Sequence, residues 1–323
     1  AKPVLTLTQL DKIKQSKFNV KHLSTLYQDN LKEALERLGE AAIQATRDGH
    51  TILVLDDSEL IDNDDESKVK EQRYAMPILL AISHIHQLLI REGLRMDTSL
   101  VALSGETREV HHVACLLGYG ANAVIPYLAQ HTIAHLTETH RLEGTVSDNV
   151  ETYTRVLSEG VIKVMAKMGI STVQSYQGAQ IFEAVGLSQE VIDDYFTGTQ
   201  SKLSGLSIQQ IDAENKMRQQ RHNEYLDSGS VFQWRQQGQH HVFNPTTIHL
   251  LQHACRENDY KQFKSFSNAV HEQRNDHLRD LLEFKAQLPI HISEVESIET
   301  IVKRFNTGAM SYGSISEEAH QTL

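Results

Sequence analysis

The stretch that most constrains the fold is residues 75–126, where helix-like and strand-like patterns alternate. Apolar residues recur at spacings of three and four from Ile78 to Leu89, which predicts a helix with one face on a core. The apolar run at residues 99–103 does not alternate in polarity, and this is typical of a parallel strand buried on both faces. A second helix and a strand at residues 122–125 follow. The stretch therefore predicts a parallel sheet with helical crossovers.

An earlier predicted strand, residues 51–55, is followed at once by Asp56, Asp57 and Ser58. Carboxylates just past the carboxyl end of a parallel strand lie where α/β folds usually place their sites. They suit a metal site or a magnesium-phosphate site. The alternative is an Asx turn and helix cap on an acidic loop. We favour the turn, because neither a second acidic motif nor a Gly-rich phosphate loop accompanies the pair.

The rest of the chain predicts many helices and few further strands. Residues 1–28 are expected to form an irregular entry segment, residues 171–175 a short strand, and residues 228–242 a surface excursion. Helices are expected at residues 31–48, 126–135, 148–168, 179–185, 189–196, 208–225, 245–256, 259–272 and 277–284. The predicted class is α/β, with parallel strands flanked by helices, a degenerate or partial β/α barrel as one form of it, and a mostly helical carboxyl-terminal half.

Charge and composition exclude several classes of function. The 31 basic and 42 acidic residues give a net charge of −11, which argues against nucleic acid as a partner. The sequence has no apolar run near the ~18 residues of a membrane span, and no secretory signal pattern. Cys115 and Cys255 lack CxxC spacing, so we expect reduced thiols in a cytoplasmic protein. The absence of an initiator Met suits a piece of a longer protein.

Candidate metal-binding and catalytic residues are few. His131 and His135, and again His249 and His253, are spaced so that each pair shares one helix face. Neither pair has the Glu of an HExxH motif or an obvious third ligand, so we favour structural roles for all four. The sequence contains no G-x-S-x-G motif and no P-loop. We therefore expect neither a metal site nor a catalytic residue in this chain.

Three long blocks resemble the glutamate synthase large subunit. The first comprises AMPILLAISHIHQLLIREGLR at residues 75–95 and GETREVHHVACLLGYGANAVIPYLA at residues 105–129. The second is KMGISTVQSYQGAQIFEAVGL at residues 167–187, and the third is VKRFNTGAMSYGSISEEAH at residues 302–320. They stand in the family's order and extend the resemblance over essentially the whole chain. One departure is at Asp56, Asp57 and Ser58, where the family tends to carry Ser-Asp-Arg.

The resemblance implies a domain plan. Residues 1–302 would be the central domain of glutamate synthase, with a linker at about residues 286–302. Residues 303–323 would begin the FMN-binding (β/α)8 synthase domain. By the same resemblance, Ala309, Met310 and Ser311 would lie against FMN. The remaining FMN ligands and the iron-sulphur ligands would lie in the parts of the polypeptide that follow.

The resemblance also implies a function. The parent enzyme hydrolyses glutamine and passes the ammonia to 2-oxoglutarate, and reduction by electrons from FMN and an iron-sulphur cluster then yields glutamate. The fragment would be inactive by itself and would connect the glutaminase and FMN-binding domains, which are its expected partners, together with a small reductase subunit as an option. The electron donor (NADPH, NADH or ferredoxin) and the oligomeric state stay open.

Two alternatives belong to other classes. One is a stand-alone flavin- or phosphate-binding half-barrel enzyme, which requires a pocket at the carboxyl ends of the strands near Asp56, Ser104 and Ser175. The other is an interaction module outside any enzyme.

Overall fold

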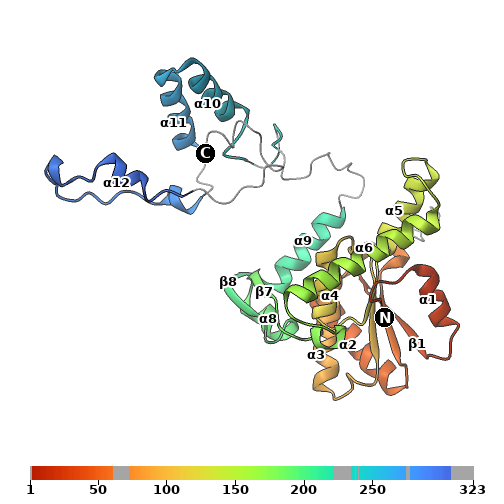
Figure 1. Cartoon of the computed structure of the whole chain (residues 1–323). Helices are drawn as coiled ribbons and strands as arrows, with labels where there is room; N and C mark the ends of the chain where they lie inside the picture. The colour runs from red at the N-terminus through yellow and green to blue at the C-terminus, as the bar shows by residue number, and fades with distance from the viewer. Residues whose placement is uncertain are drawn as a thin grey trace. The chain divides into compact units, whose positions relative to one another are not determined.

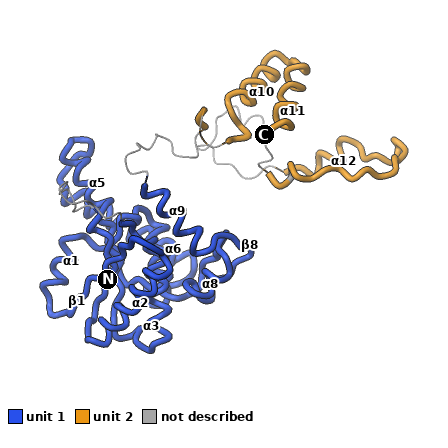
Figure 2. The backbone as a smooth tube through the Cα atoms, turned by 180° about the vertical axis from the view of Figure 1, so that it is seen from behind, with its two compact units in different colours: residues 1–225 blue, residues 226–323 orange. Residues whose placement is uncertain are grey.

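The computed structural model of the 323-residue chain describes residues 2–60, 73–220, 234–236, 238, 240–273 and 277–306. The chain divides into two units, Ala1–Tyr225 and Leu226–Leu323, and each is described by itself (Figure 2). The helices and strands of the first unit are α1 (Leu7–Lys14), β1 (Val20–Ser24), β2 (Leu26–Tyr27), α2 (Leu31–Arg47), β3 (Ile52–Asp56), β4 (Tyr74–Ala75), α3 (Ile78–Arg91), β5 (Ser99–Leu103), α4 (Val110–Gly118), β6 (Ala123–Ile125), α5 (Tyr127–Glu138), α6 (Val146–Lys167), α7 (Val173–Tyr176), β7 (Glu183–Leu187), α8 (Gln189–Tyr195), β8 (Gln200–Leu206) and α9 (Ile208–Gln220).

The central sheet of the first unit is parallel, in the order β1-β3-β5-β6. Its strands follow the order of the chain, and α2, α3 and α4 connect them in turn. A helix that connects two parallel neighbours crosses over in the right-handed sense. A strand order without reversal, with the crossover helices on one face, is the arrangement of part of a β/α barrel rather than of a doubly wound sheet.

Both faces of the sheet are buried, which explains the unbroken apolar runs. Leu53, Leu55 and Leu100 lie in a core with α2, α3 and α4, whereas Val54 and Val101 lie in a second core with Leu10 of α1. The alternation follows from the strand repeat of two residues. Figure 1 shows α1 on one side of the strands and α3 and α4 on the other. Helix α1 thus covers the face that would be the interior of a closed barrel.

The amino-terminal segment extends the sheet at β6. Val4 forms a parallel bridge with Val124, and the Leu5 N–H donates to the Val124 carbonyl over 2.9 Å. Gln130 of α5 holds the same segment, because its side-chain amide donates to the Leu5 carbonyl and accepts from the Leu7 N–H. Residues 1–28, predicted to be irregular, therefore include a pairing segment, α1 and β1.

Helices α5 and α6 pack on one another and α6 packs on α4. Gly160 allows the close crossing of α6 with α4, because a Cβ there would lie 2.3 Å from Val110 Cγ2. A smaller βαβ unit follows, in which β7 and β8 pair in parallel through α8.

Helix α9 lacks an apolar stripe; Ile208 at its start lies in the core, and polar contacts hold the rest of the helix. The Gln219 side chain accepts from the Ala75 N–H over 2.9 Å and donates to the Ala75 carbonyl over 2.9 Å. Asn215 is buried and donates to the Tyr27 hydroxyl and to the Ala75 carbonyl. Strands β2 and β4 form an antiparallel pair. The two side-chain amides hydrogen-bond to the backbone of β4 as a neighbouring strand would.

The second unit is mostly helical among its described residues. Its elements are α10 (Pro245–Glu257), α11 (Tyr260–Glu272), the 3-10 helices η2 (Leu278–Leu281) and η3 (Ile292–Glu294), and α12 (Ile298–Val302). Helices α10 and α11 pack as a hairpin whose turn contains Asn258 with a φ of 50°. Together with α6 to α9, these helices make the carboxyl-terminal half mostly helical. The predicted class, α/β with parallel strands flanked by helices, is confirmed.

Three local predictions are wrong. Residues 171–175 were predicted as a strand, but Thr172 caps α7 by accepting from the Ser175 N–H. The predicted helix at residues 179–185 overlaps β7, which pairs with a strand, β8, that the helical pattern does not reveal. At residues 277–284 only the short 3-10 helix η2 forms. Each of these stretches is short, so a tertiary contact outweighs the local preference.

Candidate functional site at the carboxyl edge of the sheet

Asp57 is the centre of the polar groups at the carboxyl edge of the sheet. Its side chain follows β3 and is buried, with 2% of its surface exposed. The carboxylate accepts from the Ser104 hydroxyl over 2.7 Å and from the Gly105 N–H over 3.0 Å. The Tyr127 hydroxyl, at the start of α5, also hydrogen-bonds to Asp57. Asp57 therefore joins the carboxyl ends of β3 and β5 to the beginning of α5.

Burial governs the electrostatics of this carboxylate. It raises the pKa of Asp57, and the hydrogen bonds from Ser104, Tyr127 and Gly105 oppose the rise without cancelling it. Ser104 and Gly105 donate to the carboxylate, and the Tyr127 hydroxyl donates to the Asp57 backbone carbonyl over 3.4 Å. A buried residue held by its side chain and by its backbone has the pattern of a structural anchor. Tyr127 also leaves no space for a side chain at Gly105, because a Cβ there would lie 3.1 Å from the Tyr127 hydroxyl oxygen.

Asp56 has different partners. Its Oδ1 accepts from the Ser58 N–H over 2.8 Å, which is the Asx turn predicted from the sequence, and also from the Ser58 hydroxyl. Its Oδ2 lies 2.7 Å from His22 Nδ1 on the neighbouring strand β1. Burial raises the pKa of Asp56, but the bonds from His22 and Ser58 outweigh it, and the pKa lies below the ordinary value. Both aspartates are thus bound to the protein itself.

Glu106 makes a third acidic contact at this edge. Helix α3 begins after Pro77, which offers no side chain to cap it. The Glu106 carboxylate, from the loop after β5, accepts from the Ile78 N–H over 2.8 Å and takes the place of the missing cap. A negative charge at a helix amino terminus also complements the helix dipole.

Ser175 does not join this group. The alternative of a half-barrel enzyme placed it with Asp56 and Ser104, but it lies in α7 and its hydroxyl accepts from the Thr172 hydroxyl. The residues after α7 contact the end of α4 and the turn that precedes β6, because the Gly178 N–H donates to the Gly118 carbonyl and the Gln177 side-chain amide donates to the Ala121 carbonyl. That turn is at the amino edge of the sheet, opposite Asp57.

Arg95, which no sequence motif marks, is the organising residue of the amino edge. Its guanidinium donates to His86 Nδ1 and to the carbonyls of Thr98 and Gly120, each over 2.8 Å, and to Asn122 Oδ1 over 3.1 Å. Burial and the adjacent Arg95 lower the pKa of His86 to about 4, so the imidazole is neutral and accepts. The cluster fixes the approach to β5 and β6.

Three of the four paired histidines make ring contacts in the described part of the chain. His131 packs at the edge of the Tyr127 ring, with ring centroids 6.0 Å apart. His249 and His253 lie side by side on α10, also 6.0 Å apart. In the described ranges, His, Cys, Asp and Glu side chains form no group of three that would hold a metal ion.

Both cysteines are free thiols, as predicted, with Cys115 half-buried and Cys255 exposed. Burial raises the pKa of Cys115 to about 11, which disfavours the nucleophilic thiolate. No described helix is long and apolar enough to cross a membrane.

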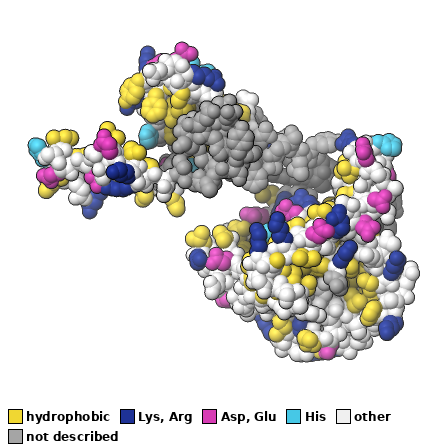
Figure 3. Space-filling view, viewed as in Figure 1, with side chains coloured by type: hydrophobic (Ala, Val, Ile, Leu, Met, Phe, Trp, Pro, Cys, Tyr) yellow, Lys and Arg dark blue, Asp and Glu magenta, His cyan; other side chains and the backbone are white. Residues whose placement is uncertain are grey.

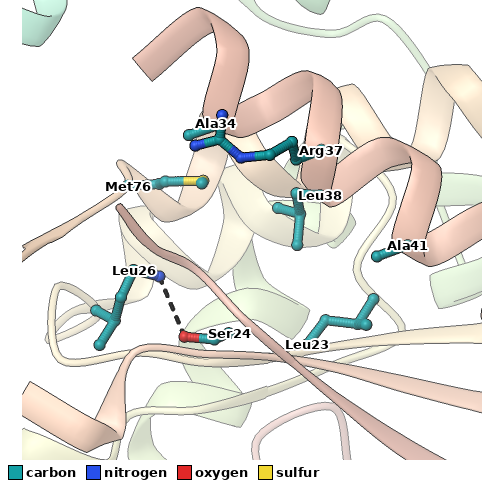
Figure 4. A pocket seen from close by; sticks show the side chains of 8 residues that line it. All are labelled: Leu23, Ser24, Leu26, Ala34, Arg37, Leu38, Ala41 and Met76. Atoms are coloured by element: carbon teal, nitrogen blue, oxygen red, sulfur yellow. Dashed lines mark hydrogen bonds between the residues drawn. The ribbon is translucent and has the colours of Figure 1, made fainter. Parts of the chain in front are cut away.

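A pocket of about 200 Å³ lies between β1 and α2. Figure 4 shows Leu23, Leu38 and Met76 around it, with the Arg37 side chain at its margin. Its lining is apolar apart from Arg37 and Ser24. None of the residues predicted to bind a ligand lines it. Ala309, Met310 and Ser311, the predicted FMN contacts, lie outside the described residues.

Comparison with known families identifies the chain. A family model for the glutamate synthase central domain matches residues 1–188, more than half of the sequence. The chain belongs to the glutamate synthase family. A second model, a conserved region in glutamate synthase, matches residues 241–323. The recognition made from the three sequence blocks is confirmed, and the alternatives outside this family are not favoured. The second match spans the boundary predicted at residue 303 and does not test it.

Several glutamate synthases are close relatives. The NADPH enzyme's large chain from Bacillus subtilis is 48% identical over 307 residues, which is 93% of this chain and 20% of that protein. The ferredoxin-dependent enzyme 1 of Arabidopsis thaliana is 37% identical, over 99% of this chain and 21% of its own length. The NADH enzyme of Schizosaccharomyces pombe is 37% identical, over 90% of this chain and 14% of its own length. The chain spans about a fifth of the length of most of these relatives.

Comparison with solved structures gives partial alignments with forms of flavocytochrome b2. The recombinant flavin-binding domain of the baker's yeast protein aligns with a TM-score of 0.35 and 15% identity, over 54% of this chain and 38% of that chain.

Proposed function

We propose that this chain is the connecting body of a glutamate synthase. In that enzyme, glutamine and 2-oxoglutarate give two molecules of glutamate with electrons from a reductant. The chain would hold the glutaminase domain and the FMN-binding domain at a fixed distance and orientation. The observation that carries the proposal is the family match over residues 1–188, which falls in the unit whose edge carboxylates are bound to the protein's own donors.

The cofactors and partners belong to the longer polypeptide in this proposal. FMN and an iron-sulphur cluster would be bound by the full-length enzyme, with Ala309, Met310 and Ser311 forming part of the FMN site. FMN supplies the electrons that reduce the imine formed from 2-oxoglutarate and ammonia. The central domain would comprise residues 1–302, with a linker at about residues 286–302, and residues 303–323 would begin the synthase domain. A small reductase subunit and a cytoplasmic location complete the proposal.

A substitution that unfolds the connecting body tests this role. In a full-length synthase that contains this chain, Leu100→Asp should raise the ratio of glutamine hydrolysed to 2-oxoglutarate consumed, because the two reactions lose their fixed geometry. Met96→Asp is the control, since Met96 is 94% exposed. An unchanged ratio in a demonstrably unfolded central domain would count against a connecting role.

A second substitution separates an anchor from a catalytic acid. We expect Asp57→Asn in the full-length enzyme to lower the thermal midpoint but to leave turnover per folded molecule within about twofold. A general acid or base at this position would instead cost about a hundredfold or more. Turnover that collapses while the thermal midpoint stays constant would favour the half-barrel enzyme over the connecting body.

A further inference from the structure

The pocket between β1 and α2 is formed within the first unit. It measures about 200 Å³, and its described lining residues lie between Leu23 and Met76. Its walls come from the end of β1, from one side of α2 and from the residue after β4, as Figure 4 shows. None of the carboxylates at the carboxyl edge of the sheet lines it. The shape of these walls is therefore a property of the first unit alone.

Two alanines of α2 leave this space open. Ala34, Leu38 and Ala41 are spaced by four and three residues, so they lie on one side of the helix. All three line the pocket. Alanine side chains end at Cβ, so the space toward β1 is unfilled on either side of Leu38. The hollow therefore results from small side chains on α2.

The floor of the pocket is apolar. Leu23, Leu38 and Met76 line it and are 6%, 5% and 2% exposed. A cavity of about 150 Å³ lined by aliphatic and aromatic side chains holds a benzene molecule, so the slightly larger space here has room for roughly six to eight carbon atoms. An apolar ligand body that displaces water from these side chains binds more tightly as more apolar area is covered. The floor thus favours a small aliphatic body.

Arg37 supplies a positive charge at the margin of the pocket. Its guanidinium lies 4.0 Å from the Glu33 carboxylate, and both side chains are more than half exposed. An exposed ion pair at this distance contributes little and leaves the arginine free to take another partner. The guanidinium presents its N–H donors in a planar fork that matches the two oxygens of a carboxylate. Arg37 is therefore placed to bind a carboxylate at the mouth of the pocket.

The lining suits one negative charge rather than several. Arg37 is the single charged side chain among the described residues that line the pocket. Ser24 adds a hydroxyl, which accepts from the Leu26 N–H over 3.4 Å and keeps its own proton to donate. Figure 3 shows Lys and Arg side chains lying among Asp and Glu side chains on the visible face of the first unit. That face has no broad basic area that would attract a polyanion.

We propose that this pocket binds a small monocarboxylate with an aliphatic body of about five carbons. The aliphatic body lies over Leu23, Leu38 and Met76, and the carboxylate accepts from the Arg37 guanidinium and the Ser24 hydroxyl. Apolar burial supplies the affinity, and the arginine selects an acid over a neutral molecule of the same size. This binding activity goes beyond the connecting role and does not rest on it.

Methionine-methyl NMR of the 323-residue chain tests the proposal, with hexanoate as the probe. The chain has six methionines, of which Met76 lines the pocket and Met96 is 94% exposed. We expect the Met76 methyl signal, assigned from the spectrum of Met76→Leu, to shift as hexanoate is added, and the Met96 signal to stay in place. Hexanol has a similar aliphatic body without the charge and should bind at least about tenfold more weakly.

Two pairs of variants locate the binding. Arg37→Ala should weaken hexanoate binding about tenfold, whereas Arg155→Ala, which removes another exposed arginine with a glutamate four residues away, should leave it unchanged. Ala41→Leu should fill the mouth of the pocket and block binding, whereas Ala166→Leu on α6 should not. All four positions are exposed, so the thermal midpoints should stay close to that of the unchanged chain.

Three results would overturn the proposal. The first is equal affinity for hexanoate and hexanol. The second is a Met76 signal that stays in place up to the solubility limit of hexanoate, or that stays while the signals of other methionines move. The third is binding that survives both Arg37→Ala and Ala41→Leu, which would place hexanoate elsewhere. None of these measurements uses a catalytic readout, so a failed pocket and a failed connecting role are distinguishable.

Discussion

At the scale of single residues, two adjacent aspartates have opposite electrostatic environments. Asp57 is enclosed by the sheet edge and α5, and burial dominates, so its pKa is raised. Asp56 is also partly buried, but the bonds from His22 and Ser58 prevail and its pKa is lowered. The side chains of neighbouring residues point to opposite sides of an extended chain, which is why one step along the sequence changes the surroundings completely.

This difference predicts opposite pH dependences of stability. The folded state holds the Asp57 proton more tightly than the unfolded chain, so the free energy of unfolding should fall as the pH rises from 3.8 to the folded pKa. Asp57→Asn should remove that fall.

For Asp56 the stabilisation is present above pH 3.8 and is lost as the pH falls from there through the lower folded pKa. Asp56→Asn should therefore remove this loss of unfolding free energy at acid pH. Urea unfolding across this range measures both, and equal profiles for the two variants would refute the assignment.

At the scale of elements, α9 shows how a polar helix is fixed to a fold. Its Gln219 and Asn215 amides satisfy both backbone groups of Ala75, where a further strand would otherwise be needed. Lys216 adds a charge over the Tyr27 ring, 5.5 Å from the centroid. These hydrogen bonds require a specific geometry. Apolar burial, which produces the periodic pattern in a sequence, does not require one.

Gln219→Leu should therefore cost about 1–3 kcal/mol of the free energy of unfolding, because it removes the acceptor of the Ala75 N–H and leaves the Ala75 carbonyl with Asn215 as its remaining side-chain donor. Gln209→Leu on the same helix is the matched control, since Gln209 is exposed and should change stability by about 0.5 kcal/mol or less. Chemical denaturation of the three proteins provides the comparison. Equal effects would show that the amide contacts to Ala75 contribute nothing.

The central strand β5 gives the strongest test of the sheet. Leu100 is fully buried between β3 and the helical layer. Leu100→Asp should cost at least about 3 kcal/mol, because an unpaired charge would enter an apolar core. Met96→Asp, a few residues earlier and almost fully exposed, should be nearly neutral. Circular dichroism during thermal unfolding distinguishes the two variants, and a small effect at Leu100 would mean that β5 is not a central strand.

At the scale of the whole molecule, the two units of the chain differ in how much apolar surface they bury. The first unit has an extensive core on both faces of its sheet. The described part of the second unit has few buried side chains, and α11 and α12 have none. We infer that the first unit supplies most of the stability of the isolated chain.

The isolated chain should be colourless and should neither hydrolyse glutamine nor oxidise a nicotinamide cofactor. The predicted FMN contacts amount to Ala309, Met310 and Ser311, and a flavin needs many more partners than one turn provides. Visible absorbance after purification in the presence of added FMN is the measurement. Yellow protein with one flavin per chain would contradict this expectation.

The sequence by itself determined the elements that repeat an apolar pattern. The strands at β3, β5 and β6, the helices between them and the family blocks are all readable, because burial imposes a period on the residues it touches. At the carboxyl edge of the sheet, the Asx turn at Asp56 was predicted from the sequence. The proximity of Asp57 to Ser104 could also be predicted, because the carboxyl ends of parallel strands lie at the same edge of a sheet. The tertiary structure alone decided the place of β1, whose Lys21 and His22 interrupt any apolar run, and the covering of the second sheet face by α1. It also decided the roles of Tyr127, Arg95 and Gln219. These side chains act on backbone groups and carboxylates far away along the chain, and a contact between distant residues leaves no period in a single sequence.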